Sequence, residues 1–188
     1  MKKIGAIILT TVLTAALATG CGNNKNNESN AAANAGNATA GTIKIGADLE
    51  LTGGQASFGD SALKGAKLAV KEINDAGGVL GKQLELIEAD NASKSEEATR
   101  AAQKLITTEK VVAIIGATTS TNTLGIVPVA QEKNIPLISS SATNPKVTVD
   151  ERSGKLNEWV FRASFIDPFQ GQVMANFATE TLKAKTAV

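Results

Sequence analysis

The sequence predicts an α/β fold in which a parallel sheet lies between layers of helices. Short apolar segments typical of strands alternate with longer segments whose apolar residues recur at helical spacing. One strand segment, residues 111–115, is entirely apolar, as a strand covered on both faces requires. Loops rich in hydroxyl groups, residues 116–121 and 139–145, follow two of the strands. Because the carboxyl ends of parallel strands lie together, these loops are expected to converge on one small ligand.

The first half of the pattern begins with a strand at residues 43–47 and a helix over about residues 60–74. The apolar stripe expected on this helix consists of Ala62, Ala66, Ala69, Val70 and Ile73. Two glycines, residues 77–78, end the helix. A second strand is expected at residues 84–89.

A second helix is expected after Ser93, which forms a capping-box pattern with Glu96. Its apolar stripe consists of Ala98, Ala101, Ala102, Leu105 and Ile106. The apolar strand at residues 111–115 follows it.

A third helix is expected over about residues 121–131, with Pro128 kinking it or shifting its start. The side chains expected to face inward are Leu124, Val127 and Ala130. Further strands are expected at residues 135–138 and 159–162. Strands separated by helices of this length give right-handed crossovers and a parallel sheet.

The start of the chain has the pattern of a secretory signal peptide, expected at residues 1–20. Lys2 and Lys3 precede an apolar run at residues 4–17, and small residues follow it. The run is shorter than the ~20 residues that a membrane-spanning helix needs.

Cys21 is the only cysteine in the chain, and residues 17–21 (Leu-Ala-Thr-Gly-Cys) resemble a bacterial lipoprotein box. The resemblance implies that Cys21 is lipidated and holds the protein on a membrane face. Ordinary cleavage with a spare thiol is the alternative. The rest of residues 21–41 is rich in Asn, Ala and Gly and is expected to be a disordered tether.

Composition argues against several classes of protein. The 188 residues carry a formal net charge of +1 and no basic patch, so nucleic acid is not an expected partner. The chain has no histidine, which excludes a Ser-His-Asp triad and imidazole metal sites. No catalytic residue, metal ligand or cofactor is expected, and Glu50 and Asp90 are interpreted as surface charges. A nucleotide-binding Rossmann-type enzyme is a distant alternative, because residues 77–83 only superficially match a phosphate loop.

Several short motifs resemble, in order and spacing, the branched-chain amino-acid-binding receptors of bacterial ABC importers. The motifs are residues 51–54, 59–60, 64–66, 72–74, 77–78, 115–116, 120, 135–139, 142–145 and 161–162, with Asp167, Gln170 and Gly171. Each motif alone is weak, but together they extend over nearly all of the chain after the tether. The resemblance implies an extracytoplasmic receptor that captures a branched-chain or other small aliphatic amino acid and delivers it to an importer.

The same resemblance implies a type 1 periplasmic-binding-protein fold, in which two α/β lobes are joined by hinge strands. Residues 42–165 would form the three-layer first lobe. Residues 166–188 would form the exit from the hinge and the first helix of a truncated second lobe. The expected protein is a monomer whose partners are the amino acid, the importer permease and, through the lipid, the membrane. The ligand-sensing domain of a signalling receptor or amide-responsive regulator is the alternative with the same fold.

The residues themselves also suggest how an amino acid would bind. Ser120 and Thr121 stand at a helix start, where unpaired N–H groups and the helix dipole favour a carboxylate. Hydroxyl groups at a helix start also serve as simple caps, and residues 139–144 could form an ordinary polar turn.

The resemblance assigns roles to four residues. Ser120 would bind the ligand carboxylate, the backbone carbonyl of Ser141 would accept from the ammonium group, and Thr143 would contact the ligand's backbone groups. Phe58 would pack near the ligand side chain. The neighbouring Thr118 and Thr119 are expected to line the pocket.

Overall fold

The computed structural model describes residues 41–186, which contain one parallel sheet with the strand order β2-β1-β3-β4-β5. The strands are β1 (Ile43–Leu49), β2 (Leu84–Asp90), β3 (Ala113–Gly116), β4 (Leu137–Ser139) and β5 (Val160–Arg162). The predicted α/β class and the parallel sheet are confirmed. The expected signal peptide, lipidated Cys21 and tether up to residue 40 lie outside the described residues.

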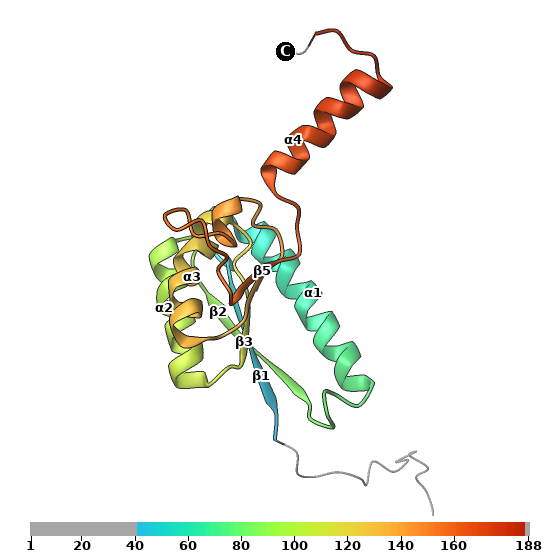
Figure 1. Ribbon diagram of the computed structural model, residues 1–188. Helices are drawn as coiled ribbons and strands as arrows, with labels where there is room; N and C mark the ends of the chain where they lie inside the picture. Colours follow the sequence, from blue (N-terminus) through green and yellow to red (C-terminus); the bar gives the residue numbers. More distant parts are fainter. Residues whose placement is uncertain (1–40, 187–188) are drawn as a thin grey trace, which may run out of the picture. The chain divides into compact units, whose positions relative to one another are not determined.

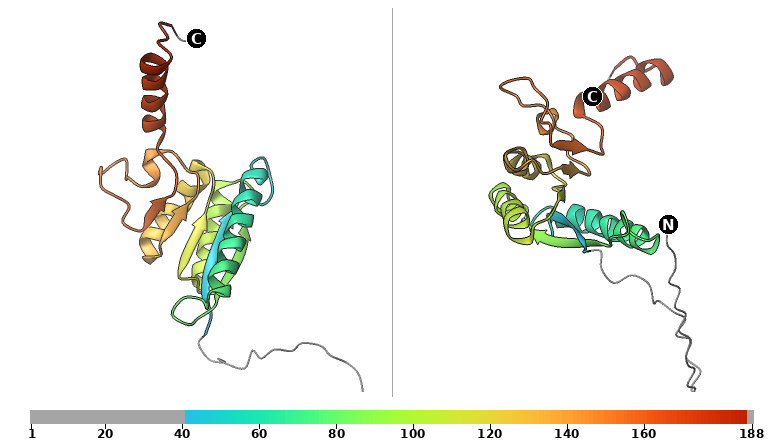
Figure 2. Two further views of the ribbon diagram at one scale, coloured as in Figure 1. Left: turned by 90° about the vertical axis from the view of Figure 1, so that its right-hand side faces the viewer. Right: turned by 60° about the horizontal axis from the view of Figure 1, so that its bottom comes forward.

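The helices are α1 (Ala56–Asp75), α2 (Ser95–Lys104), α3 (Ser120–Lys133) and α4 (Asp167–Asn176). Helices α1, α2 and α3 cover the two faces of the sheet (Figures 1 and 2). Figures 1 and 2 show α1 on one face of the sheet and α2 and α3 on the other. The α3 helix continues through Pro128 to Lys133, and no residue of α4 is buried. Within residues 41–186, none of the helices has both the length and the apolar character of a membrane span.

Two apolar clusters fill the space between the layers. The larger one joins α2 and α3 to the sheet and consists of Ala98, Ala102, Leu105, Val111, Ile114, Ala117, Ile126, Val127, Val129, Ala130, Leu137, Ala142, Val147 and Val160. The smaller one, under α1, is built on Ala47, Leu49 and Leu63. The carboxyl ends of the strands are therefore held from both sides.

The α1 helix differs from its prediction in both start and orientation. It begins at Ala56, before the expected residue 60, and Ala69 and Ile73 of the expected stripe are exposed. Gly59 and Leu63 are buried instead. A Cβ at position 59 would lie 2.0 Å from the carbonyl oxygen of Glu50. The missing side chain of Gly59 therefore lets α1 touch the end of β1, and this contact fixes which face of the helix turns inward.

The predicted capping box at the start of α2 is wrong. The N-cap residue is Lys94, and it makes no side-chain capping hydrogen bond. The Ser93 hydroxyl instead donates to the carbonyl oxygen of Thr52 at 2.7 Å and accepts from the N–H of Gln55 at 3.1 Å. Ser93 is thus used to hold the loop after β1 rather than to cap a helix.

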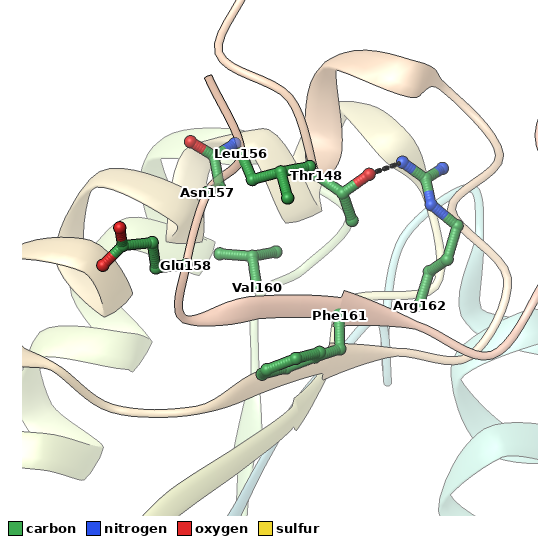
Figure 3. Close-up of a pocket in the computed structure, with 7 residues that line it drawn as sticks. All are labelled: Thr148, Leu156, Asn157, Glu158, Val160, Phe161 and Arg162. Carbon is green, nitrogen blue, oxygen red and sulfur yellow. Dashed lines mark hydrogen bonds between the residues drawn. The ribbon is translucent and has the colours of Figure 1, made fainter.

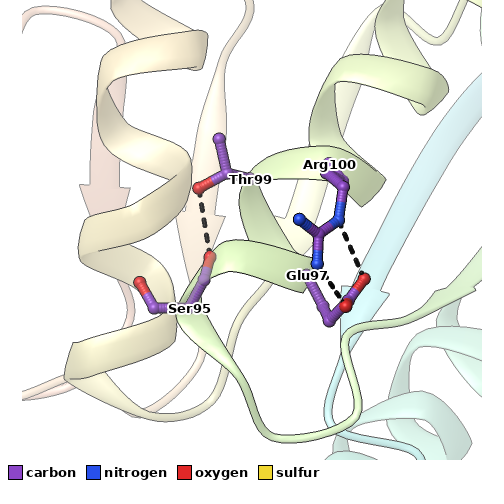
Figure 4. A network of polar contacts seen from close by, with 4 residues as sticks. All are labelled: Ser95, Glu97, Thr99 and Arg100. Carbon is purple, nitrogen blue, oxygen red and sulfur yellow. Dashed lines mark hydrogen bonds and ion pairs between the residues drawn. The ribbon is translucent and has the colours of Figure 1, made fainter.

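The α2 and α3 helices approach each other closely at Gly125. A Cβ there would lie 2.6 Å from the carbonyl oxygen of Ser95. The Thr99 hydroxyl donates to the carbonyl oxygens of Ser95 at 3.0 Å and Gly125 at 2.8 Å, and so bonds both helices. Figure 4 shows the bond to Ser95 beside the exposed ion pair of Glu97 and Arg100. This close packing fixes the position of α3, whose first turn enters the candidate site.

Candidate functional site

A crevice of about 440 Å³ opens at the carboxyl ends of β1, β3 and β4. Its walls are the start of α1 and the loops that follow β3 and β4. The lining residues are Ser57, Phe58, Ser61, Ala62, Thr118, Ser140 and Ser141. Both hydroxyl-rich loops line this crevice, one through Thr118 and the other through Ser140 and Ser141, as the sequence predicts.

Glu50 holds the loop after β3 in place. Its side chain is fully buried, at 0% exposure, so its interpretation as a surface charge is wrong. One carboxylate oxygen, Oε2, accepts from the N–H (3.0 Å) and hydroxyl (2.7 Å) of Thr118. The other, Oε1, accepts from the N–H (3.1 Å) and hydroxyl (2.9 Å) of Thr119 and from the Asn122 amide (2.9 Å). Burial alone would raise the pKa of Glu50, but these hydrogen bonds outweigh it, so the pKa lies below its ordinary value and the group is ionised.

The first turn of α3 offers hydrogen-bond donors. Thr119 is the N-cap residue, and its hydroxyl accepts from the N–H of Asn122 at 3.4 Å. No described residue accepts a backbone hydrogen bond from the N–H of Ser120 or Thr121. The Ser120 hydroxyl accepts from the N–H of Asn144 at 3.2 Å, which leaves its own proton available. This end of the site therefore suits an anionic group.

The loop after β4 offers acceptors. The Ser139 hydroxyl donates to the carbonyl oxygen of Ala117 at 2.6 Å, and the Ser141 hydroxyl donates to the carbonyl oxygen of Thr118 at 2.8 Å. With its proton engaged in this way, the Ser141 oxygen presents lone pairs to the crevice that it lines. A cationic donor would find its acceptors here.

Arg162 fixes the remainder of this loop from β5. Its guanidinium donates to the carbonyl oxygens of Ala142 and Asn144, both at 2.9 Å, and to the Thr148 hydroxyl at 2.6 Å. Figure 3 shows the contact with Thr148 at the edge of a second cavity of about 440 Å³. That cavity is lined by Thr148, Leu156, Asn157, Glu158, Val160, Phe161 and Arg162.

The residues predicted for the site lie in the same group of loops, but only some of them line the crevice. Phe58 and Ser141 line the crevice. Ser120 lies where α3 contacts the loop after β4, next to Asn144. Thr143 is half-buried, and its carbonyl oxygen accepts from the N–H of Asp167 at 3.2 Å. The Thr119 hydroxyl donates to Glu50 and is not part of the crevice lining.

Sequence reasoning missed Glu50, along with the crevice serines Ser57 and Ser61. One signal could have identified Glu50. It directly follows the buried strand β1, just as the two hydroxyl-rich loops follow their own strands. A carboxylate in that position belongs to the same edge of the sheet.

Asp48, near the end of β1, is a second buried carboxyl group beside the site. Its Oδ1 accepts from the Asn91 amide at 3.1 Å, while its buried Oδ2 has no partner among the described residues. Burial raises the pKa of Asp48 to about 8, and the carboxylates of Glu50 and Asp90 add to the rise. Among residues 41–186, no group of three or more His, Cys, Asp or Glu side chains is placed to hold a metal ion.

Comparison with known proteins relates this geometry to a family. Residues 42–188 match the family model described as periplasmic binding protein. The leucine-, isoleucine-, valine-, threonine- and alanine-binding protein of Pseudomonas aeruginosa is 36% identical over 147 residues, which is 78% of this chain and 38% of that protein.

Two solved structures are similar in sequence and in fold. The branched-chain amino acid transporter substrate binding protein LivJ from Streptococcus pneumoniae, in complex with isoleucine, is 41% identical with a TM-score of 0.68. The leucine binding protein LivK from Thermotoga maritima is 40% identical with a TM-score of 0.65. The matches cover 76% of this chain but only 39% and 38% of those chains. The chain thus spans less than two-fifths of the length of these relatives.

Proposed function

The chain belongs to the periplasmic binding protein family, and we propose that it is part of an extracytoplasmic receptor for an amino acid. The ligand is branched-chain or another small aliphatic amino acid, as the names of the relatives from Pseudomonas aeruginosa and Streptococcus pneumoniae suggest. The receptor delivers this ligand to an ABC importer. In this role the protein binds its ligand without transforming it.

The observation that carries the proposal is the placement of hydrogen-bond donors and acceptors in the loops around the crevice. A zwitterion needs donors for its carboxylate and acceptors for its ammonium group, because both groups lose water on binding. The N–H groups of Ser120 and Thr121 and the Ser120 hydroxyl, which follow the lining residue Thr118 in the chain, supply the donors. The oxygen atoms of the loop around Ser141 supply the acceptors. Phe58, which is 58% exposed, offers an apolar surface for the ligand side chain.

Thr143 and Thr119 have supporting places in this proposal. Thr143, beside the contact between Ser120 and Asn144, contacts the ligand's backbone groups. Thr119, whose hydroxyl is bound to Glu50, lines the site mainly by holding the loop.

The arrangement of the whole receptor is part of the same proposal. Residues 42–165 form the first lobe, and residues 166–188 form the hinge exit and the first helix of a second lobe that closes over the ligand. The monomeric receptor is exported by the signal at residues 1–20. Lipid on Cys21 and the tether that follows it anchor the receptor to the cell membrane, at the outer face of the cytoplasmic membrane or in the periplasm.

Calorimetric titration of the full-length protein with a panel of amino acids tests the proposal. We expect saturable binding of one or a few aliphatic amino acids. Ser120→Ala should weaken this binding about 10- to 100-fold, because it removes a hydrogen bond to a charged group. Ser153→Ala is the matched control, since Ser153 is exposed in a distant turn. A folded protein that binds none of the panel would refute the amino-acid assignment.

A further inference from the structure

We propose that Glu50 makes the crevice select ligands that carry a protonated amine, by placing a fixed negative charge directly behind Thr118. The inference deepens the proposed function and rests on it. Glu50 is a positioning residue, because its carboxylate contacts the loop after β3 and not the ligand, and the sequence predicts only a surface charge there.

The position of Glu50 follows from contacts on both of its sides. Its backbone carbonyl lies against Gly59 in α1, in the turn that also places Phe58. Its carboxylate binds the backbone and side chain of Thr118, which lines the crevice. Glu50 therefore contacts both α1 and the loop after β3, which form two walls of the crevice.

The charge of Glu50 is not neutralised by a cationic side chain. All five of its donors are neutral N–H, hydroxyl or amide groups. None of the ion pairs among the described residues includes Glu50. Hydrogen bonds spread a buried charge but do not cancel it, and a charge away from water acts over a longer range than a solvated one.

This charge affects the two ends of a zwitterion differently. It favours an ammonium group beside Thr118 and Ser141. It also opposes the attraction of the α3 N-terminus for a lone carboxylate. The charge of Glu50 therefore lowers the affinity for a simple carboxylic acid that fits the same crevice. It adds to the preference for an amino acid that the hydrogen bonds of the ammonium group already give.

The test compares leucine with 4-methylpentanoate, which is leucine without its ammonium group. Both affinities are measured by calorimetry for the full-length protein and for three variants. In Glu50→Gln, which removes the charge, the preference for leucine should fall at least about tenfold. Glu50→Asp keeps the charge but shortens its reach, so it should weaken both ligands and retain the preference. Glu72→Gln is the matched control. It removes an exposed carboxylate near the end of α1 that lies outside the crevice.

A ligand-free measurement keeps the result interpretable. In NMR spectra of the backbone amides, the Thr118 and Thr119 signals should move in Glu50→Gln and stay in place in Glu72→Gln. The remaining signals report whether the fold is intact. If Glu50→Gln weakens leucine and 4-methylpentanoate equally, Glu50 only supports the loop, and the selection role is overturned while the proposed function stands. If the unaltered protein binds no amino acid, the proposed function fails and the selection role fails with it.

Discussion

Replacing Asp48 with asparagine is expected to remove a large pH dependence from the stability of this chain. Asp48 is fully buried, and its pKa rises from 3.8 to about 8 on folding, chiefly because burial penalises the charged form. The folded state therefore holds this proton more tightly than the unfolded state does. The resulting stabilisation is complete below about pH 4 and is lost as the pH rises through about 8. At about 1.4 kcal/mol per pH unit, the loss amounts to roughly 6 kcal/mol at most.

Urea denaturation of both proteins across this range measures the effect. The asparagine side chain is neutral at every pH and could still accept the hydrogen bond from Asn91. The two proteins should be similarly stable near about pH 4, and the Asp48→Asn variant more stable by several kcal/mol near about pH 9. A stability difference that does not change with pH would refute the reasoning.

Asp90→Asn is a control for which the opposite dependence of stability on pH is expected. Burial alone would raise the pKa of Asp90, but hydrogen bonds from Thr52, Ala92 and Leu51 outweigh it and lower the pKa. Asp90 therefore stabilises the fold above its ordinary pKa, and this contribution is lost as the pH falls through the lowered value. The variant should be less stable than the unaltered protein at neutral pH.

Two further predictions concern packing and loop order. Gly59→Ala should destabilise the chain by about 2 kcal/mol or more, because its Cβ would collide with the backbone of Glu50. Gly65→Ala, in the same helix with open space around it, should leave stability unchanged or raise it by up to about 1 kcal/mol. Equal effects in urea denaturation would contradict the close approach at Gly59. Arg162→Lys should speed amide exchange in residues 142–148 about tenfold, since lysine cannot supply the same fork of donors. An equal change in the exposed Arg152→Lys control would argue against a specific role.

The sequence predicts the elements of the fold well, because their patterns are local. The alternation of strands and helices identifies the parallel sheet, and alanines at helical spacing identify the inward side of α2. The orientation of α1 could not be predicted in this way. It depends on the close contact between Gly59 and the backbone of Glu50. Glycine has no side chain, so a search for apolar side chains at helical spacing does not detect this contact.

The same reasoning limits what could be predicted of the site. The convergence of the two hydroxyl-rich loops follows from the parallel direction of the strands that precede them. The burial of Glu50 does not, because its donors come from residues 118–122, far along the chain. Ser93 illustrates the opposite error. Its sequence matches a capping box, but its hydroxyl donates to the carbonyl oxygen of Thr52 in the loop after β1 and does not cap the helix.

Hydrogen bonds connect each loop at the carboxyl edge of the sheet to the next loop. Asp90 holds the loop at Thr52, Glu50 holds the loop at Thr118, and Ser141 reaches back to the same loop. No one of these loops can open without breaking hydrogen bonds to another. Such an edge is preorganised, so an arriving ligand spends little of its binding free energy on ordering the protein. Tight binding by a small molecule with few atoms becomes attainable for that reason.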